Sequence, residues 1–254
     1  MSEQRARSFG SVAEDYDATR AGWPVGPFVI ALEHFGVPEL PDVADIAAGT
    51  GKLTRTLAQI AGTLVAVEPD ADLRAVLERE LPAVSVLDGT AEALPLADAS
   101  ADVACAGQAF HWFDVERALV EIGRVLRPQG IVIAGWNLPP EEGTWYDAVV
   151  AYLRVANPDH LPSRTQDWAA TFGAQPGYTG LLEISARHEQ PIERAAFRRL
   201  LGTHSAINVL PPARRAELLE AGVAVADSHG AFDDAGQGAI EWRCDLFAMQ
   251  RSPR

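Results

Sequence analysis

The chain has 254 residues, and 35 acidic against 21 basic side chains give it a net charge of −14. Its 48% hydrophobic and 22% charged residues are typical of a folded soluble protein and exclude a disordered chain. The acidity argues against nucleic acid and anionic membranes as partners, because both require a basic surface. No apolar run has the roughly 18 residues of a membrane span, and no signal peptide follows Arg5 and Arg7. We therefore expect a cytoplasmic protein whose Cys105 and Cys244 are buried and reduced.

Apolar periodicity predicts the first elements in chain order. Residues 1–22 predict a short amphipathic arm, and a helix is expected from Trp23 to Gly36. Short apolar runs then alternate with helical stretches, including roughly 52–60, the segment after Asp70 and the segment after Asp114. Strands are predicted over residues 43–47, 63–67, 83–87, 102–107 and 131–136, with a turn at 127–130 before the last of them.

The pattern is weaker after residue 138. Helices are predicted near 143–156 and 165–172, and then near 193–201 and 211–224. The last strands are expected at 181–187 and 240–249. Strands separated by helices favour a parallel sheet. We predict an α/β fold with a Rossmann-like, seven-stranded, mostly parallel sheet, helices on both faces and a small helical cap.

One domain is expected over residues 1–254. Within it we distinguish the arm (1–22), a cofactor-binding core (23–137), a helical cap insertion (138–180) and a C-terminal part that completes the sheet (181–254).

The most informative motif is the glycine turn between the first strand and the following helix, Asp45-Ile-Ala-Ala-Gly-Thr-Gly51. Such a turn lets a ligand approach the backbone closely and offers it free N–H groups. A phosphate-binding P-loop is excluded, because Leu53 follows Lys52 and Ile46 stands where its first glycine belongs. A dinucleotide turn is weakened by Thr54 at the position of its third glycine.

Five segments in order together resemble the class I S-adenosylmethionine-dependent methyltransferases, small-molecule subgroup, over roughly residues 9–137. The glycine turn is similar to the family's first motif, and Glu68 ends the second strand as the ribose-binding acid does. Gly89 to Leu96 resembles the adenine-flanking loop, Ala101-Asp-Val the start of the fourth strand, and Arg124 to Gly130 the turn before the fifth. Two positions depart from the family pattern: Ala47 replaces a glycine, and Thr90 an aspartate.

The resemblance implies S-adenosyl-L-methionine as the cofactor. An N-terminal arm with Tyr16 and Arg20 at i,i+4 spacing also resembles that of related enzymes, where it folds over the cofactor. The alternative for these two residues is a surface helix. The implied cofactor-binding residues are Tyr16, Arg20, Asp45, Ala47, Gly49, Gly51, Glu68, Pro69, Thr90, Ala91, Glu92 and Gln108.

The methyl acceptor is expected at the carboxyl ends of the fourth and fifth strands, where open α/β sheets bind ligands. His111 is the candidate catalytic residue, either as a general base or by orienting the acceptor. Trp112 is expected to form an apolar wall, and Trp136 and Asn137 to border the acceptor. The alternative is that these aromatic residues only pack beneath the next helix.

The function predicted from the sequence is methyl transfer from S-adenosylmethionine to a small-molecule acceptor, with oxygen preferred over nitrogen or carbon. A cofactor-binding protein that senses the cofactor or uses it in a non-methylating reaction is the first alternative, and an NAD-dependent oxidoreductase is the second. No His, Cys, Asp and Glu spacing suggests a metal site. We expect a monomer or homodimer.

Overall fold

The structure is a computed structural model that describes residues 13–139, 143–156, 167–173 and 175–252. The first part of the predicted arm (1–12) and three parts of the predicted cap (140–142, 157–166 and 174) lie outside the described residues. The chain divides into two compact units, which we describe separately. The sheet unit comprises Gly22–Asn137, Asp167–Ala186 and Cys244–Arg254, and the helical unit comprises Met1–Ala21, Leu138–Gln166 and Arg187–Arg243.

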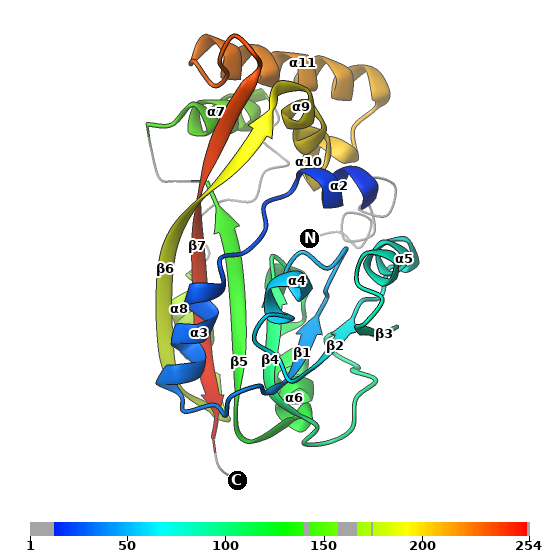
Figure 1. The fold of residues 1–254 in the computed structure, drawn as a ribbon, viewed down its shortest axis with the longest axis vertical. Helices are drawn as coiled ribbons and strands as arrows, with labels where there is room; N and C mark the ends of the chain where they lie inside the picture. Colours follow the sequence, from blue (N-terminus) through cyan, green and yellow to red (C-terminus); the bar gives the residue numbers. More distant parts are fainter. Residues whose placement is uncertain (1–12, 140–142, 157–166, 174, 253–254) are drawn as a thin grey trace. The chain divides into compact units, whose positions relative to one another are not determined.

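Seven strands form one sheet in the order β3-β2-β1-β4-β5-β7-β6 (Figure 1). They are β1 Asp42–Ile46, β2 Thr63–Val67, β3 Ser85–Leu87, β4 Ala101–Gly107, β5 Leu126–Leu138, β6 Tyr178–Glu193 and β7 Gln237–Arg251. The pairs from β3 to β5 are all parallel. β7 is antiparallel to β6, because Ser252 N–H donates to Gly177 O at one end and Arg194 N–H to Gly236 O at the other. The predicted Rossmann-like, mostly parallel sheet is confirmed.

The turn predicted before the fifth strand is instead a bulge within β5. Ala101 pairs with Leu126, but Val103 pairs with Ile131, so residues 127–130 have no counterparts in β4. Gln129 has a positive φ of 66°, which gives the bulge its tight bend.

The helices of the sheet unit are α3 Val25–His34, α4 Thr54–Leu57, α5 Ala71–Glu80, the 3₁₀ helix η2 Phe110–Trp112, α6 Val115–Val125 and α8 Trp168–Gly173. Asp70 and Asp114 begin α5 and α6 by accepting hydrogen bonds from backbone N–H groups of the first turn. α4 is shorter than the predicted helix over 52–60. Its ends pass into 3₁₀-type turns, and the hydroxyls of Thr54 and Thr56 bond to Asp45 and to Trp23 O.

Helices lie on both faces of the sheet. On one face, α3 and α4 pack against apolar strand residues that include Val103, Ile133 and Leu246. Because strand side chains alternate, Phe247 points to the opposite face, where it stacks on Phe172 of α8. Cys105 and Cys244 are free and buried within the first of these cores, as predicted.

The helical unit contains α2 Ala13–Thr19, α7 Trp145–Ala156, α9 Arg194–Gly202, α10 Ser205–Asn208 and α11 Pro212–Ser228. It has its own core, in which Tyr146, Phe197 and Leu218 are almost fully buried. The division differs from the predicted cap at 138–180. α8 joins the sheet unit because its aromatic side chains pack there, and residues 178–180 already belong to β6. None of the helices described is both long and apolar enough to cross a membrane.

Candidate functional site

The glycine turn leaves β1 with three residues in the left-handed region of backbone space. Ala47, Gly49 and Gly51 have φ values of 55°, 60° and 87°. A Cβ added to Gly49 would have no atom within 4 Å, so this glycine faces open space. A Cβ on Gly51 would instead lie 3.1 Å from the Leu77 side chain. Gly49 therefore allows a ligand to approach the backbone, whereas Gly51 allows the turn to pack on α5.

Asp45 is a fully buried carboxylate at the end of β1, with 0% of its surface exposed. Its Oδ2 accepts a hydrogen bond of 2.6 Å from Thr54 Oγ1, whereas its Oδ1 has no partner within the described structure. The Thr50 hydroxyl is likewise buried and unpartnered there. Burial raises the pKa of Asp45 to about 7, against the bond from Thr54. Buried polar groups are normally satisfied, so these two atoms mark where a polar ligand fits.

Glu68 links the end of β2 to the glycine turn. Its Oε2 accepts from Gly49 N–H and its Oε1 from Asp70 N–H, both at 2.9 Å. The carboxylate is 5% exposed, and burial raises its pKa while the two backbone N–H groups oppose the rise. Pro69 lies between these contacts and fixes the direction in which the chain leaves the strand. The carboxylate thus lies against the backbone N–H of Gly49, and each of its oxygens retains a lone pair for a further donor.

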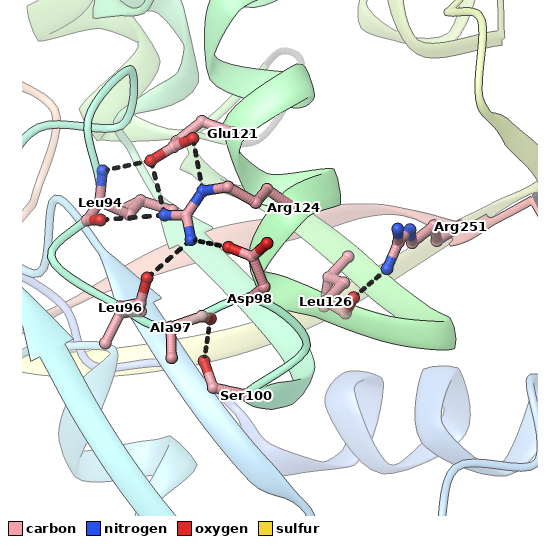
Figure 2. A network of polar contacts seen from close by, with 9 residues as sticks. All are labelled: Leu94, Leu96, Ala97, Asp98, Ser100, Glu121, Arg124, Leu126 and Arg251. Atoms are coloured by element: carbon pink, nitrogen blue, oxygen red, sulfur yellow. Dashed lines mark hydrogen bonds and ion pairs between the residues drawn. The ribbon is translucent and has the colours of Figure 1, made fainter.

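The loop from Thr90 to Leu96 is anchored to α6. Thr90 and Ala93 form an isolated antiparallel bridge, Ala91 is buried, and Glu92 Oε1 accepts from Asp114 N–H at 2.9 Å. Figure 2 shows the Arg124 guanidinium at the centre of the anchor. It donates to the carbonyls of Leu94 and Leu96, and to the carboxylates of Asp98 and Glu121.

The ends of β4 and β5 bring the predicted acceptor residues together. Gln108, with a φ of 55°, donates from Nε2 to Asn137 O at 2.6 Å. Asn137 Nδ2 in turn donates to Gly22 O at 2.9 Å. Trp136 Nε1 donates to His111 Nδ1 at 3.4 Å, and the His111 and Trp112 ring centroids lie 4.8 Å apart.

The Trp136 contact fixes the state of His111. Burial lowers the pKa of His111 to about 4, so the ring is neutral at pH 7. Since Nδ1 faces the Trp136 N–H at 3.4 Å, the contact favours the tautomer with the single ring proton on Nε2. His111 therefore offers an N–H donor to a ligand.

Trp168 is a member of this cluster that the sequence analysis missed. Its ring stacks on Trp136 with centroids 4.4 Å apart and an angle of 22° between the planes. Trp136 is only 5% exposed, so the half-buried Trp168 presents the more accessible of the two rings. Thr50 and Thr54 were also missed as site residues. The signal was available for Thr54, because a hydroxyl residue stands where the dinucleotide turn has its third glycine.

Tyr16 and Arg20 lie in the helical unit, so the structure does not place them relative to the glycine turn. Their predicted proximity on one helical face is confirmed, because the Arg20 guanidinium lies 5.3 Å from the centre of the Tyr16 ring. Their predicted role toward the cofactor stays a prediction. In the sheet unit, by contrast, the strands from β3 to β5 are neighbours, and the other predicted residues lie at or after their carboxyl ends.

This combination defines a class of protein. A parallel sheet with a glycine turn after its first strand, and buried carboxylates at the ends of its first two strands, is a binding site for a nucleoside-containing cofactor. Among the residues described, no group of three or more His, Cys, Asp or Glu side chains is arranged to hold a metal ion.

Comparison with known proteins narrows the class. Residues 44–134 match the family model described as a methyltransferase domain. The chain is 31% identical over 206 residues, 81% of each chain, to an uncharacterised methyltransferase of Schizosaccharomyces pombe. It is 34% identical over 210 residues to the malonyl-[acyl-carrier protein] O-methyltransferase of Methylococcus capsulatus, covering 76% of this chain and 65% of that one. A solved structure described as a type II methyltransferase of Anaeromyxobacter dehalogenans matches with a TM-score of 0.66 and 26% identity, over 92% of this chain and 99% of that one.

The chain therefore belongs to the class I S-adenosylmethionine-dependent methyltransferases. It is a methyltransferase, and its cofactor is S-adenosylmethionine. The comparisons thus support a methyltransferase over the two alternatives left open by the sequence, which were a non-methylating cofactor binder and an NAD-dependent oxidoreductase. The unpartnered oxygen of Asp45 and the open side of Gly49 fit that cofactor, which carries an ammonium group and hydroxyls.

Proposed function

We propose that this enzyme transfers a methyl group to an oxygen atom of a small-molecule acceptor. The observation that carries the proposal is the contact between Trp136 Nε1 and His111 Nδ1. A neutral imidazole with its proton on Nε2 donates to an acceptor oxygen and holds it in place. An amine nitrogen that attacks must present its lone pair, so it gains nothing from such a donor. The relative from Methylococcus capsulatus supports oxygen, because its name places the methyl group on an oxygen of a malonyl group.

The cofactor supplies an activated methyl group on a sulfonium sulfur, so the protein's task is to hold and align. We assign Asp45 to the cofactor's ammonium group, Glu68 to the ribose hydroxyls, and the open backbone of Gly49 to close approach. Gly51, Pro69, Ala47 and Gln108 shape the same edge of the sheet. The segment Thr90 to Glu92 flanks the adenine. Trp112, with Trp136 and Asn137 behind it, forms a wall that excludes water from the acceptor.

Of the two roles that the sequence left open for His111, the geometry favours orienting the acceptor over accepting its proton. A base with a pKa of about 4 is weak, and its free nitrogen is occupied by Trp136. An oxygen that carries no proton, such as that of a carboxylate, can be methylated without a base. The acceptor therefore needs only to be held with its oxygen in line with the methyl group.

The proposal is tested by incubating the enzyme with S-adenosylmethionine carrying a ¹³C-methyl group and a size-filtered metabolite extract. The ¹³C chemical shift of the transferred methyl group separates oxygen, nitrogen and carbon products. We expect an O-methyl product together with S-adenosylhomocysteine. A methyl signal on nitrogen or carbon alone would refute the choice of oxygen. A methylated product that forms only with the macromolecules retained by the filter, and not with the filtered metabolites, would refute a small acceptor.

The role of His111 is tested with the product found in that assay. His111→Gln keeps a side-chain N–H donor, whereas His111→Ala removes it and should lower kcat/KM by roughly 100-fold. We expect His111→Gln to keep most of the wild-type kcat/KM. When kcat/KM is measured against pH, it should not fall on the acidic side at pH values above about 5, because the pKa of His111 is about 4. A limb near neutrality that disappears in His111→Gln would instead identify a general base.

We further infer a cytoplasmic enzyme, monomeric or homodimeric, that does not act on nucleic acid. The net charge of −14 supports this inference, because binding to nucleic acid depends on the release of counterions by basic side chains. A gel-shift assay with RNA and duplex DNA should give no complex at physiological salt.

A further inference from the structure

Arg20 is a cation in the helical unit that none of the described carboxylates pairs with. Its Nε donates to Thr203 Oγ1 at 2.8 Å, and its guanidinium lies over the Tyr16 ring. Thr203 is fully buried and passes its own hydroxyl proton to Leu200 O at 2.7 Å. Only one of the five N–H donors of Arg20 is therefore used by the described residues, and the planar Nη edge remains available.

Several arginines of the helical unit pair with carboxylates. Arg194, Arg198 and Arg214 each lie within 2.7 Å of a carboxylate oxygen, and Arg199 lies 3.9 Å from Asp15 of α2. Arg215 donates to Gly202 O at 3.3 Å and, like Arg20, has no ion pair with a described carboxylate. Arg20 is also half-buried beside the apolar core of its unit, where an uncompensated charge is costly.

Two neutral hydrogen-bonding side chains are connected to the partner of Arg20, because His204 follows Thr203 in the chain and Tyr146 contacts His204. Tyr146 Oη and His204 Nε2 lie 3.4 Å apart, at the long end of hydrogen-bond distances. Burial raises the pKa of Tyr146 to about 12, and burial together with the charge of Arg20 lowers the pKa of His204 well below its usual value. Both side chains are therefore neutral at pH 7 and lie in the field of the Arg20 charge. His204 is half-buried, so a ligand can reach it.

We propose that Arg20, Tyr146 and His204 form a binding site for a carboxylate group of a small molecule. The Nη edge of Arg20 matches the two oxygens of a carboxylate, and the hydrogen-bonded pair of Tyr146 and His204 retains one further donor. The ligand's negative charge supplies the counter-charge that no described residue gives to Arg20. Phosphate offers the same charge without the planar match.

Direct binding tests the site without any methyl-transfer assay. The thermal stability of the full chain is measured with malonate, succinate and glutarate, each against its neutral diamide and against sodium chloride at equal ionic strength. A ligand that binds the folded state raises the melting temperature by mass action. We expect at least one dicarboxylate to raise the melting temperature above both references. If all three fail to do so with the wild-type chain, the proposal is wrong.

Variants then locate the binding. Arg20→Met and Tyr146→Phe should abolish most of the dicarboxylate shift, and Arg20→Lys, which keeps the charge but not the planar fork, should retain part of it. Arg198→Met and Tyr152→Phe change the same residue types elsewhere in the helical unit and should leave the shift intact. An equal loss in Arg198→Met would indicate a general charge effect and overturn the assignment to Arg20.

The cofactor itself has a carboxylate, so a second measurement separates the two sources. S-adenosylhomocysteine carries that carboxylate, whereas 5′-methylthioadenosine lacks it. We expect 5′-methylthioadenosine to bind Arg20→Met and the wild type with equal affinity, which also demonstrates that the variant is folded. A selective loss of S-adenosylhomocysteine affinity would assign Arg20 to the cofactor and overturn the proposal. These outcomes do not depend on which atom is methylated, so they remain readable if the proposed function fails.

Discussion

Ala47 adopts a backbone conformation that suits glycine. Its φ of 55° costs an L-residue roughly 1–2 kcal/mol, which is the physical reason for a glycine at this position of the motif that the turn resembles. We predict that Ala47→Gly raises the free energy of unfolding by about 1 kcal/mol, as measured by urea denaturation. Ala44→Gly, within β1, should lower it by about 0.5–1 kcal/mol, because Ala44 lies in a regular buried strand. Destabilisation by both substitutions would contradict the strain assigned to Ala47.

Asp45 should make the folded protein lose stability as pH rises. Its pKa is about 7 in the folded protein against 3.8 in an unfolded chain, so between these values the folded state binds more protons. Within that window the loss approaches about 1.4 kcal/mol per pH unit. We predict that Asp45→Asn removes this slope, as measured by denaturation at pH 4 to 8.

Asp42 provides a control of opposite sign. Bonds from Thr63 and Arg127 lower the pKa of Asp42, so its contribution is present above pH 3.8 and is lost as pH falls through the lowered pKa. Asp42→Asn should therefore reduce stability at neutral pH. An Asp45→Asn variant with the wild-type pH slope would show that Asp45 is ionised in the folded protein.

At the scale of elements, α6 holds the loop that flanks the predicted adenine position. We predict that Arg124→Met lowers stability by roughly 2–3 kcal/mol, because it removes charge-assisted bonds to two carbonyls and two carboxylates (Figure 2). It should also weaken S-adenosylhomocysteine binding, as measured by calorimetry. Arg117→Met, an exposed position on the same helix, should change neither quantity by a measurable amount. Unchanged cofactor affinity in Arg124→Met would separate this loop from the cofactor.

The sequence predicted the strands and helices of the cofactor half to within a few residues, because their periodicity and caps are local. β2 matches the prediction residue for residue, and Asp114 begins α6 as expected. The errors arose where tertiary contacts override local preference. α4 is cut short by threonine hydroxyls that bond to other elements, and residues 127–130 bulge because β4 and β5 pair on either side of them.

The candidate site was predictable to different degrees. Asp45, Glu68 and Gly49 follow from a contiguous motif, and the structure brings them together. The stack of Trp168 on Trp136 joins residues 32 positions apart and has no local signature. Likewise, the grouping of Arg20, Tyr146 and His204 depends on three separate segments. Such long-range contacts are decided by packing, which one sequence does not reveal.

At the scale of the whole molecule, cofactor binding should be visible as stabilisation. We predict that S-adenosylmethionine and S-adenosylhomocysteine raise the melting temperature, with about 2.7 kcal/mol of stabilisation at a hundredfold excess over Kd. NAD should have no effect, because Thr54 replaces the third glycine of the dinucleotide turn and its hydroxyl is committed to Asp45. A shift with NAD alone would contradict the family assignment.

The helical unit is assembled from three separate stretches of chain, Met1–Ala21, Leu138–Gln166 and Arg187–Arg243, and its boundaries fall inside β6 and β7 and at the end of β5. A recombination event with one crossover therefore never transfers it alone. If this unit holds a carboxylate-binding site around Arg20, the ligand preference of that site is more readily changed by point substitution within the unit than by inheritance of a foreign unit. A designer who wishes to graft another specificity must exchange all three stretches together, and must match the strand registers at each junction.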